Sequence, residues 1–241
     1  MKIMTFNIRI DVAVDGKNKF TNRLEEIIEF IQEEKPDIIG FQEVNQFMLT
    51  SLSDNLIKYN YVGEPRDEDG EYNPIFYLQK HSRIKTRTHW LSDTPNIPGS
   101  KHPDAYFPRI YTTLTIDIDN QLYEIVNTHL SHISDVARID GMKALIEYYK
   151  ENSIKNFILM GDFNAYPDQG VNEIITEDLK SCWDNYQEDT LTFHNFSDKT
   201  VGLPIDYIFS SKNINILKTT IHRNKINNKF LSDHYPVSMI I

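Results

Sequence analysis

The chain has 241 residues, a length that fits one large domain or two small ones, since domains typically contain about 100–200 residues. Hydrophobic residues make up 40% of the sequence and aromatic residues 12%, which provides for a sizeable core and excludes a mainly disordered chain. The 25 Lys and Arg residues against 35 Asp and Glu residues give a net charge of −10. A protein this acidic is poorly suited to unspecific binding of nucleic acid or of an anionic membrane surface.

Cysteine usage and hydropathy indicate the compartment. The single cysteine, Cys182, excludes a disulfide framework and a Cys-rich zinc site, and it fits a reducing environment. No stretch approaches the ~20 apolar residues of a membrane span. The N-terminal sequence MKIMTFNIRI lacks the long apolar core of a signal peptide. We therefore expect a cytoplasmic protein that does not bind membranes, with a monomer as the default oligomeric state.

The first half of the chain predicts strands interspersed with helices. Apolar residues at helical spacing predict helices at residues 21–35, which Pro36 ends, and 48–56. Alternating or continuously apolar runs predict strands at residues 2–9, 38–41, 74–78 and 84–91. A proline-rich loop follows at residues 92–108, and loops of this length inside compact domains are often functional.

The second half is richer in strands. Residues 110–118 and 122–130 flank Asp119-Asn120-Gln121, which is typical of a hairpin turn. One helix is predicted at residues 135–150, and further strands at residues 157–160, 204–210, 215–222 and 235–241. No repeat, low-complexity tract or linker divides the sequence, so we expect a single domain over residues 1–241. Most of the strands alternate, unlike the central strands of a doubly wound parallel sheet, and therefore indicate packed sheets flanked by helices.

Polar side chains recur where the predicted apolar strands end. Such positions gather functional groups because the scaffold is rigid there and the loops are open. The residues are Asn7, Glu43, Asn127, His129, Asp162, Asn164, Asp206, Asp233 and His234. They supply oxygen ligands and two imidazoles but no thiolate, a set that suits Mg²⁺ or Mn²⁺ better than zinc. Glu43 is the best single candidate for a carboxylate ligand.

Each of these residues also has a structural explanation. Asn7 fits an ordinary edge position, and Glu43 fits a cap for the helix that follows it. The Gly-Asp-Phe-Asn sequence at 161–164 is a plausible turn. His129 fits a hydrogen-bonded core histidine, and Asp233-His234 a surface pair. Residue type and spacing alone leave these alternatives open.

The order of six short motifs narrows the choice. These motifs are Thr-Phe-Asn-Ile-Arg (5–9), Phe-Gln-Glu-Val (41–44), Asn-Thr-His-Leu (127–130), Gly-Asp-Phe-Asn (161–164), Ile-Asp-Tyr-Ile-Phe (205–209) and Ser-Asp-His-Tyr-Pro-Val (232–237). Together they resemble the endonuclease/exonuclease/phosphatase superfamily, which includes deoxyribonucleases, abasic-site endonucleases, neutral sphingomyelinases, inositol-polyphosphate 5-phosphatases and deadenylases. Within it, residues 70–77, 90–95 and 192–196 resemble a bacterial branch closest to the deadenylase-like members.

The resemblance implies a fold and a metal site. The fold is α/β (α+β), a DNase I-like four-layer αββα sandwich in which two packed, mainly antiparallel sheets are flanked by helices and the site lies at one end of both sheets. Glu43 would be the principal Mg²⁺ ligand, with Asn7 and Asp233 completing or flanking the metal site. Mn²⁺ is a possible substitute, and both one ion and two ions are compatible with the motifs.

The same resemblance implies roles in hydrolysis. Asp162 would activate or orient the attacking water, and Asn164 would hold that water or a phosphate oxygen. His234 would contact the scissile phosphate, oriented by Asp206, and His129 would contact the phosphate and assist the leaving oxygen. The residues considered alone agree, because an adjacent carboxylate keeps an imidazolium available near neutral pH. No residue stands out as a covalent nucleophile, so we expect a single in-line displacement by water.

Three further residues are expected to contact substrate or its surroundings. Glu71 matches a glutamate that, in deoxyribonuclease-like members, pairs with the histidine matched by His129. Arg109 is the best cationic candidate for the substrate phosphate, and His194 a candidate substrate contact. Aromatic side chains in two segments expected near the site mouth, residues 92–108 and 192–199, fit either stacking on a substrate ring or anchoring of the loops.

Charge favours a small nucleotide-like or sugar-phosphate substrate over nucleic acid, since a dedicated duplex-DNA enzyme carries a basic stripe. One basic stripe exists, formed by His81, Arg83, Lys85, Arg87 and His89. We favour the interpretation that this stripe is a charged edge strand that discourages aggregation of sheets. The alternative is a surface that binds nucleic acid and leads to the site. There are two competing hypotheses. In one the protein is a nuclease that acts on DNA or RNA, and in the other it is a metal- or ligand-binding module without turnover.

Overall fold

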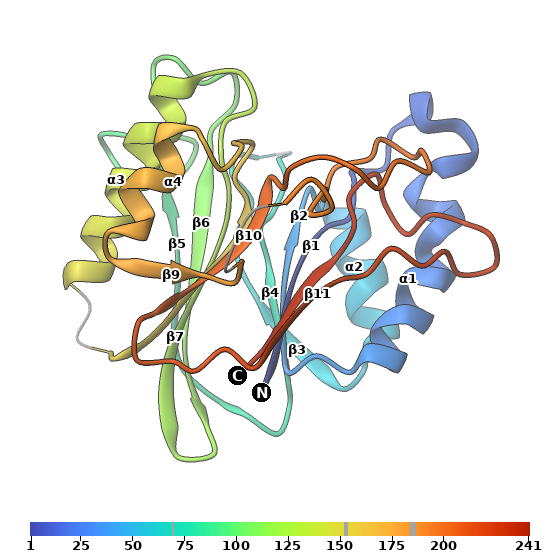
Figure 1. The fold of residues 1–241 in the computed structure, drawn as a ribbon, viewed down its shortest axis with the longest axis horizontal. Helices are drawn as coiled ribbons and strands as arrows, with labels where there is room; N and C mark the ends of the chain where they lie inside the picture. Colours follow the sequence, from blue (N-terminus) through green and yellow to red (C-terminus); the bar gives the residue numbers. More distant parts are fainter. Residues whose placement is uncertain (69, 152–153, 184–186) are drawn as a thin grey trace.

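The computed structural model describes residues 1–68, 70–151, 154–183 and 187–241. Over these residues two six-stranded sheets pack face to face, and helices cover both outer faces (Figure 1). The expected four-layer αββα sandwich is confirmed. None of the helices in the described ranges combines the length and apolar character needed to cross a bilayer.

The first sheet joins the N-terminal strands to the C-terminal ones. Its strands are β1 (Lys2–Asn7), β2 (Ile38–Gln42), β3 (Tyr59–Val62), β4 (Ile75–Leu78), β11 (Lys218–Ile221) and β12 (Val237–Ile240). They lie in the order β11-β12-β1-β2-β4-β3. The helices on its outer face are α1 (Phe20–Glu34) and α2 (Gln46–Asn55), and a short 3-10 helix, η1 (Ala13–Asn18), precedes α1.

The second sheet comes from the middle of the chain. Its strands are β5 (Ser82–Trp90), β6 (Ile110–Ile118), β7 (Gln121–His129), β8 (Asn156–Asp162), β9 (Leu179–Ser181) and β10 (Asp206–Ser211). Their order is β5-β6-β7-β8-β10-β9. Helices α3 (Asp135–Glu151) and α4 (Gly170–Thr176) cover its outer face (Figure 1). The sequence pattern did not predict β3, β9, α4 and η1, because segments of three to seven residues are too short to display a period.

Each sheet contains one parallel pair, and all other pairings between its named strands are antiparallel. Strands β1 and β2 run parallel with α1 between them, and β7 and β8 run parallel with α3 between them. The register pairs Asn7 with Gln42 in the first sheet and His129 with Asp162 in the second. The carboxyl ends of both parallel pairs therefore present polar side chains at the same edge of the sandwich.

Apolar side chains fill the three spaces between the four layers. Ile27 and Ile31 of α1 are fully buried in a cluster with Phe6 of β1, and a second cluster fills the space between the sheets. Leu145 of α3 packs in a third cluster with Phe157 of β8. Burying each such side chain contributes about 1.5–3 kcal/mol, so these clusters provide most of the rigidity on which the polar edge depends.

A buried polar network joins the sheets just below that edge. The Asn127 Nδ2 group of β7 donates to the Phe41 carbonyl at 2.8 Å, and Gln42 Nε2 donates to Asn127 Oδ1 at 2.6 Å. Gly40 makes this approach possible, because a Cβ there would lie 2.7 Å from the Asn127 side chain and 2.6 Å from Met160 Cε. Asn127 thus connects the sheets and does not belong to the site that the strand-end pattern suggested.

Candidate active site

A cavity of about 550 Å³ opens at the edge where the two parallel strand pairs end. Eight of the eleven predicted site residues line it: Glu43, Glu71, Arg109, His129, Asp162, Asn164, Asp233 and His234. Asn7 and Asp206 lie directly behind this lining, since they are hydrogen-bonded to Asp162 and His234 respectively. His194 is the one predicted site residue that neither lines the cavity nor lies directly behind its lining.

The ends of β1 and β2 form the acidic side of the cavity. Glu43 follows β2 in a left-handed backbone conformation, with φ of 60°, which turns its side chain out of the strand direction. Its Oε2 accepts from the Ile10 amide at 3.1 Å, and its Oε1 accepts from Asn7 Nδ2 at 3.1 Å. Asn7 Nδ2 also donates to Asp162 Oδ2 at 3.0 Å, and Asn7 Oδ1 accepts from the Arg9 amide at 3.0 Å. Asn7 therefore bridges carboxylates contributed by the two sheets.

Asp233 completes this acidic side and makes it suitable for a cation. Burial raises the pKa of Asp233, and the nearby Glu43 carboxylate raises it further against the opposing effect of His234. The Arg9 guanidinium lies 3.8 Å from Glu43 Oε2 and 3.8 Å from Asp233 Oδ2, while it donates to Asp15 at 3.0 and 3.2 Å. Glu43 and Asp233 are thus carboxylates that lie close together, with Arg9 neutralising only part of their charge. Carboxylate oxygens without a thiolate are a set of donors that fits Mg²⁺ or Mn²⁺.

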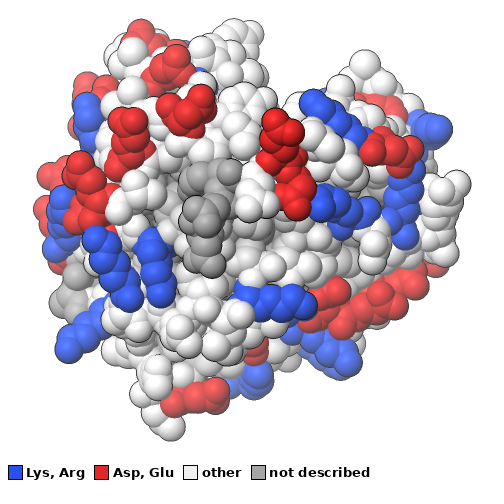
Figure 2. Space-filling view, in the orientation of Figure 1, with Lys and Arg blue, Asp and Glu red and all other residues white. Residues whose placement is uncertain are grey.

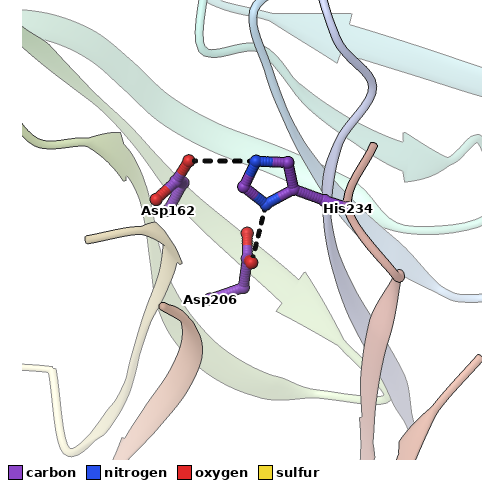
Figure 3. Close-up of side chains that lie close together, drawn as sticks. All are labelled: Asp162, Asp206 and His234. Carbon is purple, nitrogen blue, oxygen red and sulfur yellow. Dashed lines mark hydrogen bonds and ion pairs between the residues drawn. The ribbon is translucent and has the colours of Figure 1, made fainter. Parts of the chain in front are cut away.

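His234 lies between two carboxylates (Figure 3). Its Nδ1 is 2.9 Å from Asp206 Oδ2 of β10, and its Nε2 is 3.8 Å from Asp162 Oδ2 of β8. Burial alone lowers the pKa of His234, but the two carboxylates outweigh it and raise the pKa to about 10. The imidazole is therefore a cation at neutral pH, held by Asp206 and presented toward the cavity.

Asp162, Asp206 and His234 each bring one potential ligand atom within 4.8 Å of the others, a grouping that could hold a metal ion. The same side chains also form a chain of carboxylate and imidazole groups, since His234 Nδ1 lies 2.9 Å from Asp206 Oδ2. Burial and the charge of Asp206 raise the pKa of Asp162 to about 7. The cluster can therefore also hold and move protons.

His129 and Asn164 line another side of the cavity with an imidazole and an amide. Asn164 Nδ2 lies 2.9 Å from His129 Nε2 and donates to the Leu130 carbonyl at 3.1 Å. Burial and the charge of Arg109 hold the pKa of His129 well below its ordinary value, so the ring is neutral. Its Nε2 accepts from the amide, which leaves the proton on Nδ1, a buried atom with no hydrogen-bond partner in the described ranges.

The position of Glu71 corrects one expectation. Glu71 does not pair with His129: its Oε2 accepts from Arg66 Nη1 at 2.8 Å. Arg109 lines the cavity as expected, with Nη2 2.9 Å from Nδ1 of His132. No sequence pattern singled out Arg66 and His132, although Arg66 lies four residues before the segment of residues 70–77 and His132 follows the Asn-Thr-His-Leu motif.

The position of His194 corrects a second expectation. Its ring is 3% exposed, stacks on Tyr235 at 3.9 Å between centroids, and donates from Nδ1 to the Ser197 carbonyl at 3.0 Å. It supports the loop from behind and does not line the cavity. Its neighbours Phe193 and Asn195 line the cavity instead. The prediction therefore identified the correct segment but the wrong residue within it.

The basic stripe of residues 81–89 lies mainly on β5, which is an edge strand of the second sheet. This is the position that the aggregation-preventing interpretation requires. Basic and acidic side chains are interspersed on the face of the molecule shown in Figure 2. The cations that face the candidate site, Arg9, Arg66 and Arg109, belong to the cavity itself.

Comparison with known sequences agrees with this architecture. The model of the Endonuclease/Exonuclease/phosphatase family matches residues 4–234. The uncharacterized protein L388 of Acanthamoeba polyphaga mimivirus is 28% identical over 280 aligned positions, covering 100% of this chain and 99% of the viral protein.

Solved structures extend the comparison. An endonuclease/exonuclease/phosphatase from Bacteroides vulgatus has a TM-score of 0.91 and 28% identity, covering 99% of this chain and 97% of its own. A mannosyl-6-phosphatase from Bacteroides thetaiotaomicron VPI-5482 has a TM-score of 0.92 and 25% identity, covering 100% and 98%. TDP2 from D. rerio, complexed with a single-strand DNA product, has a TM-score of 0.78 and 16% identity over 99% and 97%, and shares the fold.

Proposed function

Because the chain belongs to the Endonuclease/Exonuclease/phosphatase family and is thus a phosphoester hydrolase, we propose that it is a Mg²⁺-dependent phosphatase of small phosphorylated sugars. The observation that carries this proposal is the enclosure of Arg109 within the cavity: its side chain lines the cavity, and the residue is only 7% exposed. A cation in this position suits a phosphate group that enters the cavity. A polymer lying across the surface would need exposed cations along its path.

The metal is held on the acidic side. Glu43 and Asp233 provide carboxylate oxygens, and Asn7 flanks them with an amide oxygen that retains a second lone pair beside its bond to the Arg9 amide. When bound there, Mg²⁺ neutralises charge on the phosphoryl oxygens and acts as a Lewis acid. Family members generally depend on a divalent metal, and the choice of Mg²⁺ follows from the oxygen donor set.

Proton handling belongs to the side chains around β8 and β10. Asp162, with a pKa raised to about 7, accepts a proton from the attacking water while the water oxygen bonds to phosphorus. The bond from phosphorus to the sugar oxygen breaks on the opposite side. His234 remains protonated and donates a hydrogen bond to a phosphoryl oxygen, as Asp206 maintains its orientation.

Two neutral side chains complete the arrangement. Asn164 holds the water or a phosphoryl oxygen, and His129 lies beside it, with Nε2 2.9 Å from Asn164 Nδ2 and 3.5 Å from Asp162 Oδ2. From this position His129 assists the leaving sugar oxygen, which takes up its proton from solvent. Arg109 binds a non-bridging phosphate oxygen, since its charge has no carboxylate partner within 4 Å among the described residues. A cytoplasmic location and a monomeric state remain predictions.

The test is Mg²⁺-dependent hydrolysis across a mixed panel. The panel contains hexose 6-phosphates, p-nitrophenyl phosphate, bis-p-nitrophenyl phosphate, dinucleotides, oligo(A) and supercoiled plasmid, each also incubated with a Glu43→Gln variant. We expect release of inorganic phosphate from the sugar phosphates and no cleavage of the polymers. Cleavage of plasmid or oligo(A), falling steeply with added salt, would instead identify a nuclease and reject the sugar-phosphatase proposal.

A further inference from the structure

An ion pair with an aromatic ring beside it lines the cavity but has no part in the hydrolysis proposed above. Arg66 Nη1 donates to Glu71 Oε2 at 2.8 Å, and Arg66 Cζ lies 4.3 Å from the centroid of the Phe107 ring. The side chains of Arg66 and Glu71 are 10% and 16% exposed, and Phe107 is 37% exposed. All three line the cavity, so a substrate inside it meets both charges and the ring.

The backbone fixes this pair in place. The Arg66 amide donates to the Glu71 carbonyl at 3.0 Å, and the Arg66 carbonyl accepts from Trp90 Nε1 at 2.6 Å. Only 10% of the Arg66 side chain remains exposed, so these contacts fix its orientation in the cavity wall.

Arg66 and Arg109, two of the three arginines that line the cavity, differ in how their charge is compensated. Glu71 neutralises Arg66, whereas the polar partner of Arg109 is the imidazole of His132. Anion binding is therefore favoured at Arg109 and disfavoured beside Glu71, where a second phosphate would meet a carboxylate. The pair at Arg66 instead offers donors and acceptors together, which matches a hydroxyl group, since a hydroxyl both donates and accepts.

We propose that Arg66, Glu71 and Phe107 form a subsite that binds the neutral, hydroxyl-bearing part of the substrate and so selects phosphorylated sugars over esters without hydroxyl groups. Glu71 accepts from a sugar hydroxyl, Arg66 donates to the same or a neighbouring one, and the Phe107 ring covers an apolar face of the sugar. This inference rests on the proposed function, because it assigns the part of the substrate that the hydrolytic residues do not contact.

The test compares two phosphate esters in one enzyme. The measured quantity is the ratio of kcat/KM for a hexose 6-phosphate to kcat/KM for phenyl phosphate, an ester with no hydroxyl group outside the phosphate. Glu71→Gln retains the shape of the side chain but removes its charge, and Arg66→Met retains a long stem but removes the donors. We expect each variant to lower the ratio at least about tenfold, because a site built to hydrogen-bond a hydroxyl loses selectivity when its partners are removed.

A matched control and the native enzyme separate the possible failures. Glu68 is an exposed glutamate of the same loop, so Glu68→Gln should leave the ratio within about twofold of the native value. A ratio that stays at the native value in both Glu71→Gln and Arg66→Met would overturn the subsite and leave the proposed function standing. If the native protein releases no phosphate from sugar phosphates, the proposed function fails and the subsite fails with it.

Discussion

The two strand–helix–strand units, β1–α1–β2 and β7–α3–β8, place different chemistry at equivalent positions. Each ends at the same edge of the sandwich, one with Asn7 and Glu43, the other with His129 and Asp162. The first unit contributes an amide and a carboxylate beside an arginine, and the second contributes an imidazole and a carboxylate with a raised pKa. In the mechanism proposed above, the scaffold would thus separate the holding of a cation from the handling of protons.

The C-terminal strand connects the two units. Asp233 and His234 are adjacent in sequence just before β12, yet Asp233 faces Arg9 and the acidic side while His234 faces Asp206 and Asp162. Alternation of side chains at a strand end accounts for this division, because consecutive residues point to opposite sides. One dipeptide would therefore supply a residue to each of the two proposed functions, and mutations on the two sides should have separable effects.

The largest effect is expected on the acidic side. Glu43→Gln should reduce Mg²⁺-dependent turnover by about 10³-fold or more, because a metal contributes several kcal/mol of transition-state stabilisation. Mg²⁺ or Mn²⁺ binding measured by calorimetry should weaken in parallel. The exposed Glu33→Gln serves as the control with native activity. Undiminished metal affinity in Glu43→Gln would show that the ion is held elsewhere.

On the proton-handling side, His234→Ala should reduce kcat by about 10²–10⁴-fold, the range typical of a group acting on the transition state. Metal affinity should change far less than in Glu43→Gln, which distinguishes the two sides. A thermal unfolding curve near that of the native protein would show that the fold is retained. Near-native activity of His234→Ala would reject the assigned mechanism.

Asp206→Asn should cost less than His234→Ala, about 10–100-fold in kcat, because it weakens the orientation of His234 without removing the ring. It should also lower the pKa of His234, since the Asp206 carboxylate is what raises it most. The pH dependence of kcat would report this change as an earlier loss of activity on the alkaline side. A loss equal to or greater than that of His234→Ala would favour direct metal binding by Asp206.

The sequence predicted which residues lie on the two sides of the cavity better than it predicted their hydrogen-bond partners and side-chain directions. Strand ends and motif order identified Glu43, Asp162 and His234, because Glu43 and Asp162 lie at the ends of apolar strands and His234 lies just before the last one. Motif order could not show that Glu71 pairs with Arg66, since that contact depends on how the chain folds back between β3 and β4, where the Arg66 amide donates to the Glu71 carbonyl. It also could not distinguish His194 from Phe193 as the residue facing the cavity, because one step along an extended segment reverses the side-chain direction.

A smaller effect is expected from Arg9, the cation that lies between the carboxylates Glu43 and Asp233. Arg9→Gln should lower the melting temperature of the metal-free protein by a few degrees, about 2–4 °C per kcal/mol for a chain of this size. The stabilisation on adding Mg²⁺ should then exceed that of the native protein, because repulsion between the carboxylates is relieved only by the ion. Arg87→Gln on the exposed β5 edge is the matched control. Equal Mg²⁺-induced shifts in native and Arg9→Gln protein would contradict this view.

The smallest effect concerns the loop behind His234. Burial lowers the pKa of His194 to about 4, while the same side chain in the unfolded chain titrates near 6.5. As pH falls below about 6.5, the unfolded chain binds a proton that the folded protein excludes, so the free energy of unfolding decreases between pH 6.5 and 4 and is unaffected by His194 above this window. Melting temperatures at pH 7.5 and 5 should therefore diverge less in His194→Gln than in the native protein. If the melting temperatures of the two proteins depend on pH in the same way, the ring takes up its proton without leaving the stack on Tyr235. This loop would then be more open to solvent than the acidic side of the cavity.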